Sequence, residues 1–258
     1  MLILLPPSER KTPARRGAPV DLAGLSFPAL TETRAAVLET LVRLCRDQPA
    51  AAAAALGLGS GHEQALAGNA ALLRAPAVAV ERLYCGVLYD ALDLAGLQGV
   101  ARRRARAWLV VISGAWGALR PTDRVPAYKL PIDARLPGLP PLGALWRPGL
   151  AEVLPDAAGD GLVVDMRSSG YVGAWPPAGE LARRTVAVRV LREREGTRSV
   201  VSHMAKHYRG LLARHLLDGP SPPTDPVGLA ERAAQRWRVE LVEPPGPRPR
   251  VLNLVVDD

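Results

Sequence analysis

The feature that most constrains this chain is a repeated arrangement in which a short apolar run is followed at once by a polar or glycine-bearing cluster. Residues 2–5, 107–112 and 161–164 are such runs, and they stop at a proline pair, a serine-glycine pair and an aspartate. Short apolar runs bounded by turn residues are typical of buried strands. Open α/β sheets bind their ligands at the carboxyl ends of the strands. We therefore expect an α/β protein with a ligand site along that edge.

The remaining pattern predicts helices around a mixed sheet. Residues 31–45 carry apolar side chains at helical spacing, with Thr31 as a suitable cap. Residues 185–191 and 198–202 are expected to form an antiparallel pair. Further helices are expected over 62–73, 80–92, 203–217 and 227–237, and a closing hairpin over 238–243 with 250–256. We expect a single domain over 1–258, with a helical subregion at about 31–95 that includes the low-complexity alanine tract 50–55.

The charge of the chain favours partners that carry phosphate. The net charge is +8 and the isoelectric point is about 10.2, a balance that favours nucleic acid, nucleotides or other anionic ligands. Of the 33 basic residues, 30 are arginine. Heavy use of alanine, arginine, glycine and proline indicates a GC-rich genome in which arginine displaces lysine. The three lysines are therefore the informative cations: Lys11, Lys129 and Lys206.

Two candidate clusters follow residues 2–5 and 107–112. Ser8, Glu9 and Lys11 place a hydroxyl, a carboxylate and an ammonium within four residues, which suits phosphate binding or proton transfer. A solvated loop is the alternative. The second cluster combines flexible backbone with a guanidinium fork and a phenol, in Ser113, Gly114, Arg120, Tyr128 and Lys129. Its Arg-Pro-x-Asp run is equally compatible with a structural turn held by an arginine–aspartate pair.

Two further clusters lie in the second half of the chain. The first follows residues 161–164 and contains Asp165, Arg167, Ser168 and Tyr171, and an aspartate that only caps the next turn is the alternative. The second contains His203, Lys206, His207 and Arg209, of which the first three share one face of the predicted helix. Two histidines four residues apart can bind a metal, but the pattern offers no third ligand. We expect no metal site and no cofactor.

Taken together, the four clusters resemble the YaaA family of peroxide-stress proteins over almost the whole chain. Residues 6–11 are similar to the family's Pro-Pro-Ser-Glu-Gly-Lys, with Arg10 in place of the glycine, and residues 113–123 to its Ser-Gly-x-x-Gly-x-Leu-Arg-Pro-x-Asp. Residues 126–130 match Pro-Tyr-(Arg/Lys)-Leu with Ala127 inserted. The remaining matches are Ser-x-x-Tyr at 168–171, Ala-Lys-x-x-(Arg/Lys)-Gly at 205–210, and a family position at Gly86 and Tyr89. Asp165 stands where other members have asparagine.

The resemblance implies a mixed α/β fold of the YaaA type with a basic cleft and a helix-hairpin-helix-like element. It also implies affinity for DNA and a role in limiting peroxide damage, linked to intracellular iron. Leu56-Gly57-Leu58-Gly59 fits the hairpin, where backbone N–H groups at Gly57 and Gly59 would bind phosphate without reading sequence. An ordinary helix-breaking glycine loop is the alternative. Arg10 in place of glycine would add charge to the pocket and alter its choice of ligand.

These observations leave two main classes of function, with a scaffold that performs no chemistry as a third. The first is a YaaA-like DNA-binding protein of the peroxide response that contacts duplex DNA non-specifically, since only 4% of residues are aromatic and available for base stacking. The second is an enzyme acting on a nucleotide, nucleobase or other anionic small molecule. Its candidate catalytic residues are Glu9, Lys11, Asp165 and Lys206, because lysine, unlike arginine, can lose its proton. An exposed basic stripe would favour DNA, and a deep convergent pocket would favour the enzyme.

The chain is also expected to be a cytoplasmic monomer with no membrane contact. Its first residues lack the basic region and long apolar stretch of a signal peptide. No window approaches the ~18 consecutive apolar residues that span a bilayer. Cys45 and Cys85 lack metal-type spacing and are expected to be reduced, buried thiols.

Overall fold

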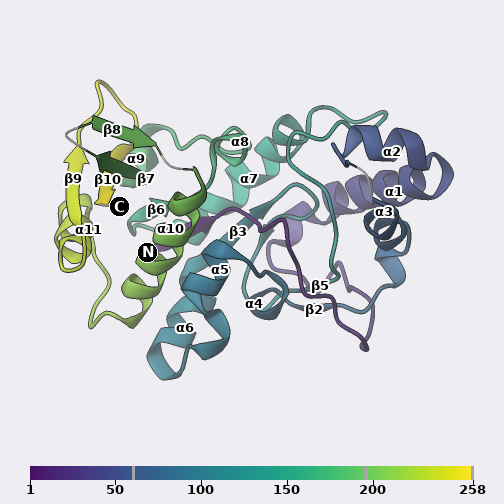
Figure 1. Ribbon diagram of the computed structural model, residues 1–258, viewed down its shortest axis with the longest axis horizontal. Coiled ribbons are helices and arrows are strands. Elements are labelled where there is room, and N and C mark those ends of the chain that lie inside the picture. The colour runs from purple at the N-terminus through teal and green to yellow at the C-terminus, as the bar shows by residue number, and fades with distance from the viewer. Residues whose placement is uncertain (60–61, 195–196, 201, 257–258) are drawn as a thin grey trace.

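The structure is a computed structural model that describes residues 1–59, 62–194, 197–200 and 202–256. This part of the chain is built around an eight-stranded mixed sheet of order β4-β3-β1-β6-β7-β10-β9, with β8 paired to β7 (Figure 1). The parallel strands are β1 (Leu2–Leu5), β3 (Leu109–Ser113), β6 (Val163–Asp165), β7 (Thr185–Arg194) and β10 (Arg250–Val256). The antiparallel strands are β4 (Gly117–Leu119), β8 (Thr197–Val200) and β9 (Arg238–Val242). The expected α/β class, with a mixed sheet flanked by helices, is confirmed.

The helices divide into groups along the sheet. They are α1 (Thr31–Asp47), α2 (Pro49–Ala55), α3 (Glu63–Ala70), α4 (Val80–Leu83), α5 (Val87–Leu92), α6 (Gly99–Trp108), α7 (Leu142–Ala158), α8 (Ser169–Val172), α9 (Gly179–Arg183), α10 (Ser202–Asp218) and α11 (Pro226–Ala234). α10 packs against α5, α6 and β7, while α6 also contacts β1 and β3. α1, α2 and α3 lie together at the end of the molecule opposite β8 and β9 (Figure 1). A small separate sheet pairs β2 (Val78–Ala79) with β5 (Arg124–Val125).

The register of the central strands brings their carboxyl ends to one edge. β1 lies between β3 and β6, with Leu5 opposite Val111 and Leu4 opposite Asp165. Every side chain of β1 and β3 is buried, as expected for central parallel strands covered on both faces. The segments that follow β1, β3 and β6 therefore leave the sheet at neighbouring points.

Some local predictions are corrected by the structure. The helix expected over 80–92 is broken between α4 and α5, where Gly86 has a φ of 101° that a helix cannot accommodate. The alanine tract, which lies within the expected helical subregion, forms α2. Residues 107 and 108 end α6 and do not belong to the strand that follows. α7 gives no clear pattern in the sequence because it contains Pro148 and Pro155.

Two expectations about organisation stay predictions: the single domain over 1–258 and the helix-hairpin-helix-like element. In the part of the chain that the structure describes, no helix has both the length and the apolar character needed to cross a bilayer.

Candidate functional site

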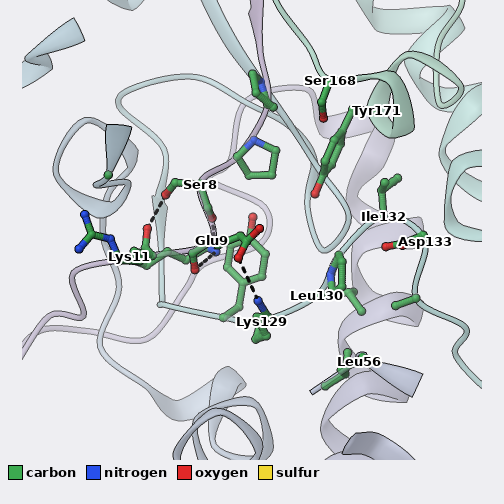
Figure 2. Close-up of a pocket in the computed structure, with 18 of the residues that line it drawn as sticks. Ser8, Glu9, Lys11, Leu56, Lys129, Leu130, Ile132, Asp133, Ser168 and Tyr171 are labelled. Carbon is green, nitrogen blue, oxygen red and sulfur yellow. Dashed lines mark hydrogen bonds and ion pairs between the residues drawn. The ribbon is translucent and has the colours of Figure 1, made fainter. Parts of the chain in front are cut away.

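Segments from distant parts of the sequence enclose a pocket of about 1180 Å³ at the carboxyl edge of the sheet. Residues 6–11 leave β1, Ser168 and Tyr171 follow β6, and residues 128–135 belong to the connection between β5 and α7. The end of α2, the segment 85–89 and the helix α10 complete the walls. Figure 2 shows the Ser8–Lys11 segment on one side of this space and Ser168 with Tyr171 on another.

All three lysines of the chain line this pocket. Lys11 comes from the loop after β1, Lys129 from the connection after β5, and Lys206 from α10. More than a hundred residues separate Lys11 from Lys129 in the sequence, so only the fold brings them together. Every lysine of this arginine-rich chain therefore lines the same pocket.

The loop that carries Lys11 also holds its side chain in place. Lys11 Nζ donates to the carbonyl oxygen of Ser8 at 2.8 Å, and the carbonyl oxygen of Glu9 lies 3.5 Å away. The same nitrogen lies 4.2 Å from the centroid of the Tyr128 ring and 5.6 Å from that of Tyr84. The ammonium position is thus defined by contacts from three segments of the chain.

The surroundings of Lys11 make its proton easy to lose. Burial, and after it the positive charge of Lys129, lower the pKa of Lys11 to about 7, against smaller opposite effects of Cys85 and Glu9. Near neutral pH the side chain therefore populates both its charged and its neutral form. A group that transfers protons uses both forms, and a group that attacks a ligand uses the neutral form.

Lys129 is positioned through its main chain. The fully buried Asn69 of α3 donates from Nδ2 to the Lys129 carbonyl at 2.7 Å and accepts the Lys129 N–H at 2.9 Å. Lys129 Nζ lies 3.9 Å from a carboxylate oxygen of Glu9, whose side chain is 80% exposed. Because so exposed a pair is weak, the Lys129 ammonium is available to a ligand.

A chain of buried hydroxyls lies behind Lys11. Ser113 Oγ is 2.6 Å from the Tyr128 hydroxyl, which is 2.8 Å from the Tyr84 hydroxyl. Burial raises the pKa of both tyrosines well above the ordinary value, so both phenols stay protonated. Ser113 also accepts the N–H groups of Ala115 and Trp116. It supports the pocket from behind and does not line it.

The opposite wall carries further cations and hydroxyls. Lys206 and Arg209 extend from α10, and Ser168 and Tyr171 from the segment after β6. Arg209 donates to the Val188 carbonyl at 3.0 Å, while its buried Nε has no hydrogen-bond partner among the described residues. Burial raises the pKa of Tyr171, so its phenol is a donor. These groups are suited to binding an anion.

Asp165 and Arg167 lie outside the pocket and pair with each other. Arg167 Nη2 is 2.7 Å from Asp165 Oδ2, and both side chains are buried. Asp165 Oδ1 also accepts the Arg167 backbone N–H at 3.0 Å, so this carboxylate holds the turn after β6. The Arg167 guanidinium further donates to the carbonyls of Tyr171 and Trp175. Asp165 and Arg167 therefore stabilise the turn after β6, and neither residue lines the pocket.

Arg120 and Gly114 also lie away from the pocket surface. The Arg120 guanidinium donates to the Ala107 carbonyl, and Asp123 accepts the Arg120 backbone N–H at 2.7 Å, which makes this run a structural turn. At Gly114 an added Cβ would lie 2.7 Å from the Leu130 carbonyl oxygen, so the glycine allows two chains to pack closely. Among the candidates that follow different strands, Lys11, Lys129, Ser168 and Lys206 line the pocket, and Arg120 and Asp165 do not.

Gly57 ends α2 in a Schellman motif. Its φ is 60°, its N–H donates to the Ala54 carbonyl, and the N–H of Leu58 donates to the Ala53 carbonyl. Gly57 lines the pocket but its N–H is already used, which favours the ordinary-loop interpretation at this position. Gly59 does not line the pocket. The His203 side chain lies outside the described residues.

The cap geometry predicts a difference between the two glycines. Gly57→Ala is expected to lower the free energy of unfolding by about 1 kcal/mol, because alanine is strained at positive φ. Gly59→Ala is the matched control: it lies in the same segment without a positive φ and with open space around its Cα, so a change within about 0.5 kcal/mol is expected. Urea unfolding of both variants measures this. Equal stability of the two would contradict the assignment of Gly57 as the cap.

Sequence reasoning did not find three residues that shape the site: Asn69, Tyr84 and Cys85. Tyr84 and the half-buried Cys85 lie in the break between α4 and α5, and Lys11 forms a β-bridge with Tyr84. The glycine that follows them was the available signal, since it interrupts the helical pattern. Asn69 gives no such signal, because a single amide on a helix resembles any surface residue.

The fold and the pocket define an α/β protein whose sheet edge carries a site rich in lysine and tyrosine. The family model for the peroxide stress protein YaaA matches residues 1–235, and the chain belongs to this family. A UPF0246 protein of Streptomyces coelicolor is 48% identical over 260 residues, covering 100% of this chain and 99% of the relative. A UPF0246 protein of Corynebacterium efficiens is 37% identical over 260 residues, covering 99% and 100%. The resemblance inferred from the motifs is confirmed.

Proposed function

We propose that this member of the peroxide stress family is an enzyme that acts on an anionic small molecule, with Lys11 at its reaction centre. The observation that carries the proposal is the gathering of all three lysines of an arginine-rich chain in one pocket. Arginine is the better residue for a permanent charge, whereas lysine alone of the two can exchange its proton. The use of lysine here therefore favours chemistry in addition to charge.

The charge and size of the pocket favour a small anion. Among the described lining residues, the cationic side chains outnumber the acidic ones: Arg10, Lys11, Lys129, Arg135, Lys206 and Arg209 against Glu9 and Asp133. Ligand pockets commonly measure ~300–1000 Å³, so about 1180 Å³ leaves room for a ligand of nucleotide size. A convergent pocket of this kind supports the enzyme more than it supports a DNA-binding stripe.

Pyrophosphate binding tests the anion site. We expect calorimetry at low salt to detect binding, and Lys129→Met and Lys206→Met each to weaken it by about tenfold, the effect of losing one charge-assisted hydrogen bond. Arg103→Met is the matched control, because it removes one positive charge at an exposed position of α6 outside the pocket. Equal weakening in the control would show a general charge effect and contradict the site.

DNA affinity, implied by the family resemblance, stays a prediction supported by the net charge of +8. Non-specific duplex binding would weaken steeply between low and physiological salt as counterions are released. If pyrophosphate does not bind and duplex DNA binds with this salt dependence, the DNA-binding function replaces the enzyme.

A further inference from the structure

We propose that Lys11 forms an imine with the aldehyde or ketone group of the ligand, which rests on the proposed function of the pocket as a site for anionic small molecules. Lys11 lines the pocket, and its Nζ is held at a defined position, 2.8 Å from the Ser8 carbonyl oxygen and 4.2 Å from the Tyr128 ring centroid. A nitrogen held in one place next to a bound carbonyl carbon reacts with it as if both belonged to one molecule. Such a positioned reaction is much faster than the reaction of two free molecules.

The surroundings of Lys11 supply the neutral amine that such an attack requires. Nearby charged and titratable groups come from each segment around it: Glu9 on its own loop, Lys129 from the connection after β5, Cys85 and Tyr84 from the α4–α5 break, and Tyr128. Burial and Lys129 together bring the pKa of Lys11 to about 7. Burial and a neighbouring cation are the two means by which proteins activate imine-forming lysines.

The other cations of the pocket define the ligand class. Lys129, Lys206 and Arg209 are placed to hold a phosphate or carboxylate, and the buried Arg209 Nε has no hydrogen-bond partner among the described residues. With the anionic group placed there, the carbonyl group of the same molecule is assigned to Lys11, which lines the same pocket of about 1180 Å³. The structure thus favours a small carbonyl compound that carries a negatively charged group.

The step balances without any oxidant or reductant. The lone pair of neutral Nζ attacks the carbonyl carbon, a C–N bond forms, and the carbonyl π electrons move to oxygen. Both amine protons pass to that oxygen, directly or through solvent, and the C–O bond breaks to release one water. The products are the imine and water. Protonation of the imine nitrogen then draws electrons from the adjacent carbon and makes its bonds easier to break.

Reductive trapping with pyridoxal 5′-phosphate tests the inference. The protein is incubated with this probe and reduced with borohydride, and the label at each of its three lysines is measured by peptide mass spectrometry. We expect at least about tenfold more label at Lys11 than at Lys129 or Lys206, because imine formation needs a neutral amine. Added pyrophosphate should protect Lys11, and pyridoxal, which lacks the phosphate, should label it less. Arg103→Met should label as the parent does.

The outcomes separate this inference from the proposed function. Equal label on the three lysines, with pyrophosphate bound, overturns the imine and leaves the anion site intact. Preferential label at Lys11 by pyridoxal and its phosphate alike, without pyrophosphate binding, supports the imine and overturns the anion site. The initial labelling rate at Lys11 should rise through about pH 7 and then level off. A rise that continues toward ~10.5, the value for an ordinary lysine, overturns the inference.

Discussion

Asp165→Ala is expected to lower the free energy of unfolding by about 3–5 kcal/mol, the usual cost of removing one partner of a buried ion pair. The guanidinium of Arg167 is fully buried and lies 2.7 Å from Asp165 Oδ2. Without the carboxylate, this charge stays in the interior with no acidic partner among the described residues, next to the carbonyls of Tyr171 and Trp175 and the Trp175 ring. Urea unfolding followed by circular dichroism measures the loss.

Two comparisons make this prediction specific. Asp165→Asn should cost less than Asp165→Ala, because the amide oxygen still accepts the Arg167 backbone N–H. Asp156→Ala removes an exposed carboxylate from α7 and should change stability by no more than about 0.5 kcal/mol. If Asp165→Ala unfolds at the same urea concentration as the parent, the pair does not stabilise the turn after β6.

Lys11→Met is expected to abolish the peroxide protection that the family resemblance predicts for this protein, and Lys11→Arg is expected to do nearly the same. Arginine keeps the positive charge, so pyrophosphate affinity should fall by no more than about threefold, well under the tenfold loss of a charge-assisted contact. Arginine does not lose its proton at any working pH. Since positioned proton transfer contributes ~10²–10⁴ in rate, its loss removes function while binding persists.

Survival after a peroxide challenge tests the Lys11 prediction, measured in a deletion strain that carries either the parent gene or one of the variants. Thermal melting of the purified variants checks that each one folds. Arg103→Lys is the control for a charge-preserving exchange, because Arg103 is exposed on α6 outside the pocket, and this variant should survive as the parent does. If the Lys11→Arg strain survives as well as the parent, Lys11 acts only through its positive charge, and its assignment as a reacting group is wrong.

Much of the sheet was predictable because its strands are marked locally. The buried run at residues 2–5 ends at a proline pair, and 161–164 ends at an aspartate, so both strands could be found from a few neighbouring residues. The antiparallel pairing of β7 with β8 was predictable because a Glu-Gly pair at 195–196 in the sequence separates two runs with strand pattern. α7 was not found, because its two prolines disrupt the local pattern while tertiary packing still holds the helix.

The candidate site was predictable only in part. The lysines stood out by composition, since arginine dominates the rest of the chain, and all of them line the pocket. Asn69 and Tyr84 could not be found in this way, because their roles depend on contacts with Lys129 and Lys11 from distant segments. Asn69 and Lys129 are 60 residues apart, so the residues next to each of them in the sequence do not indicate that the two are hydrogen-bonded.

The sequence by itself determined which segments reach the carboxyl edge, because strand ends and turn residues are encoded within a few positions. It also determined which cations could exchange a proton, because that depends on residue type. Only the tertiary structure decided which side chains line the pocket. The Asp165 carboxylate lies in the interior, where it pairs with the buried Arg167 guanidinium. The Arg120 guanidinium donates to the Ala107 carbonyl. Lys11 and Lys129 face the pocket because the packing of separate segments leaves open space on that side of them.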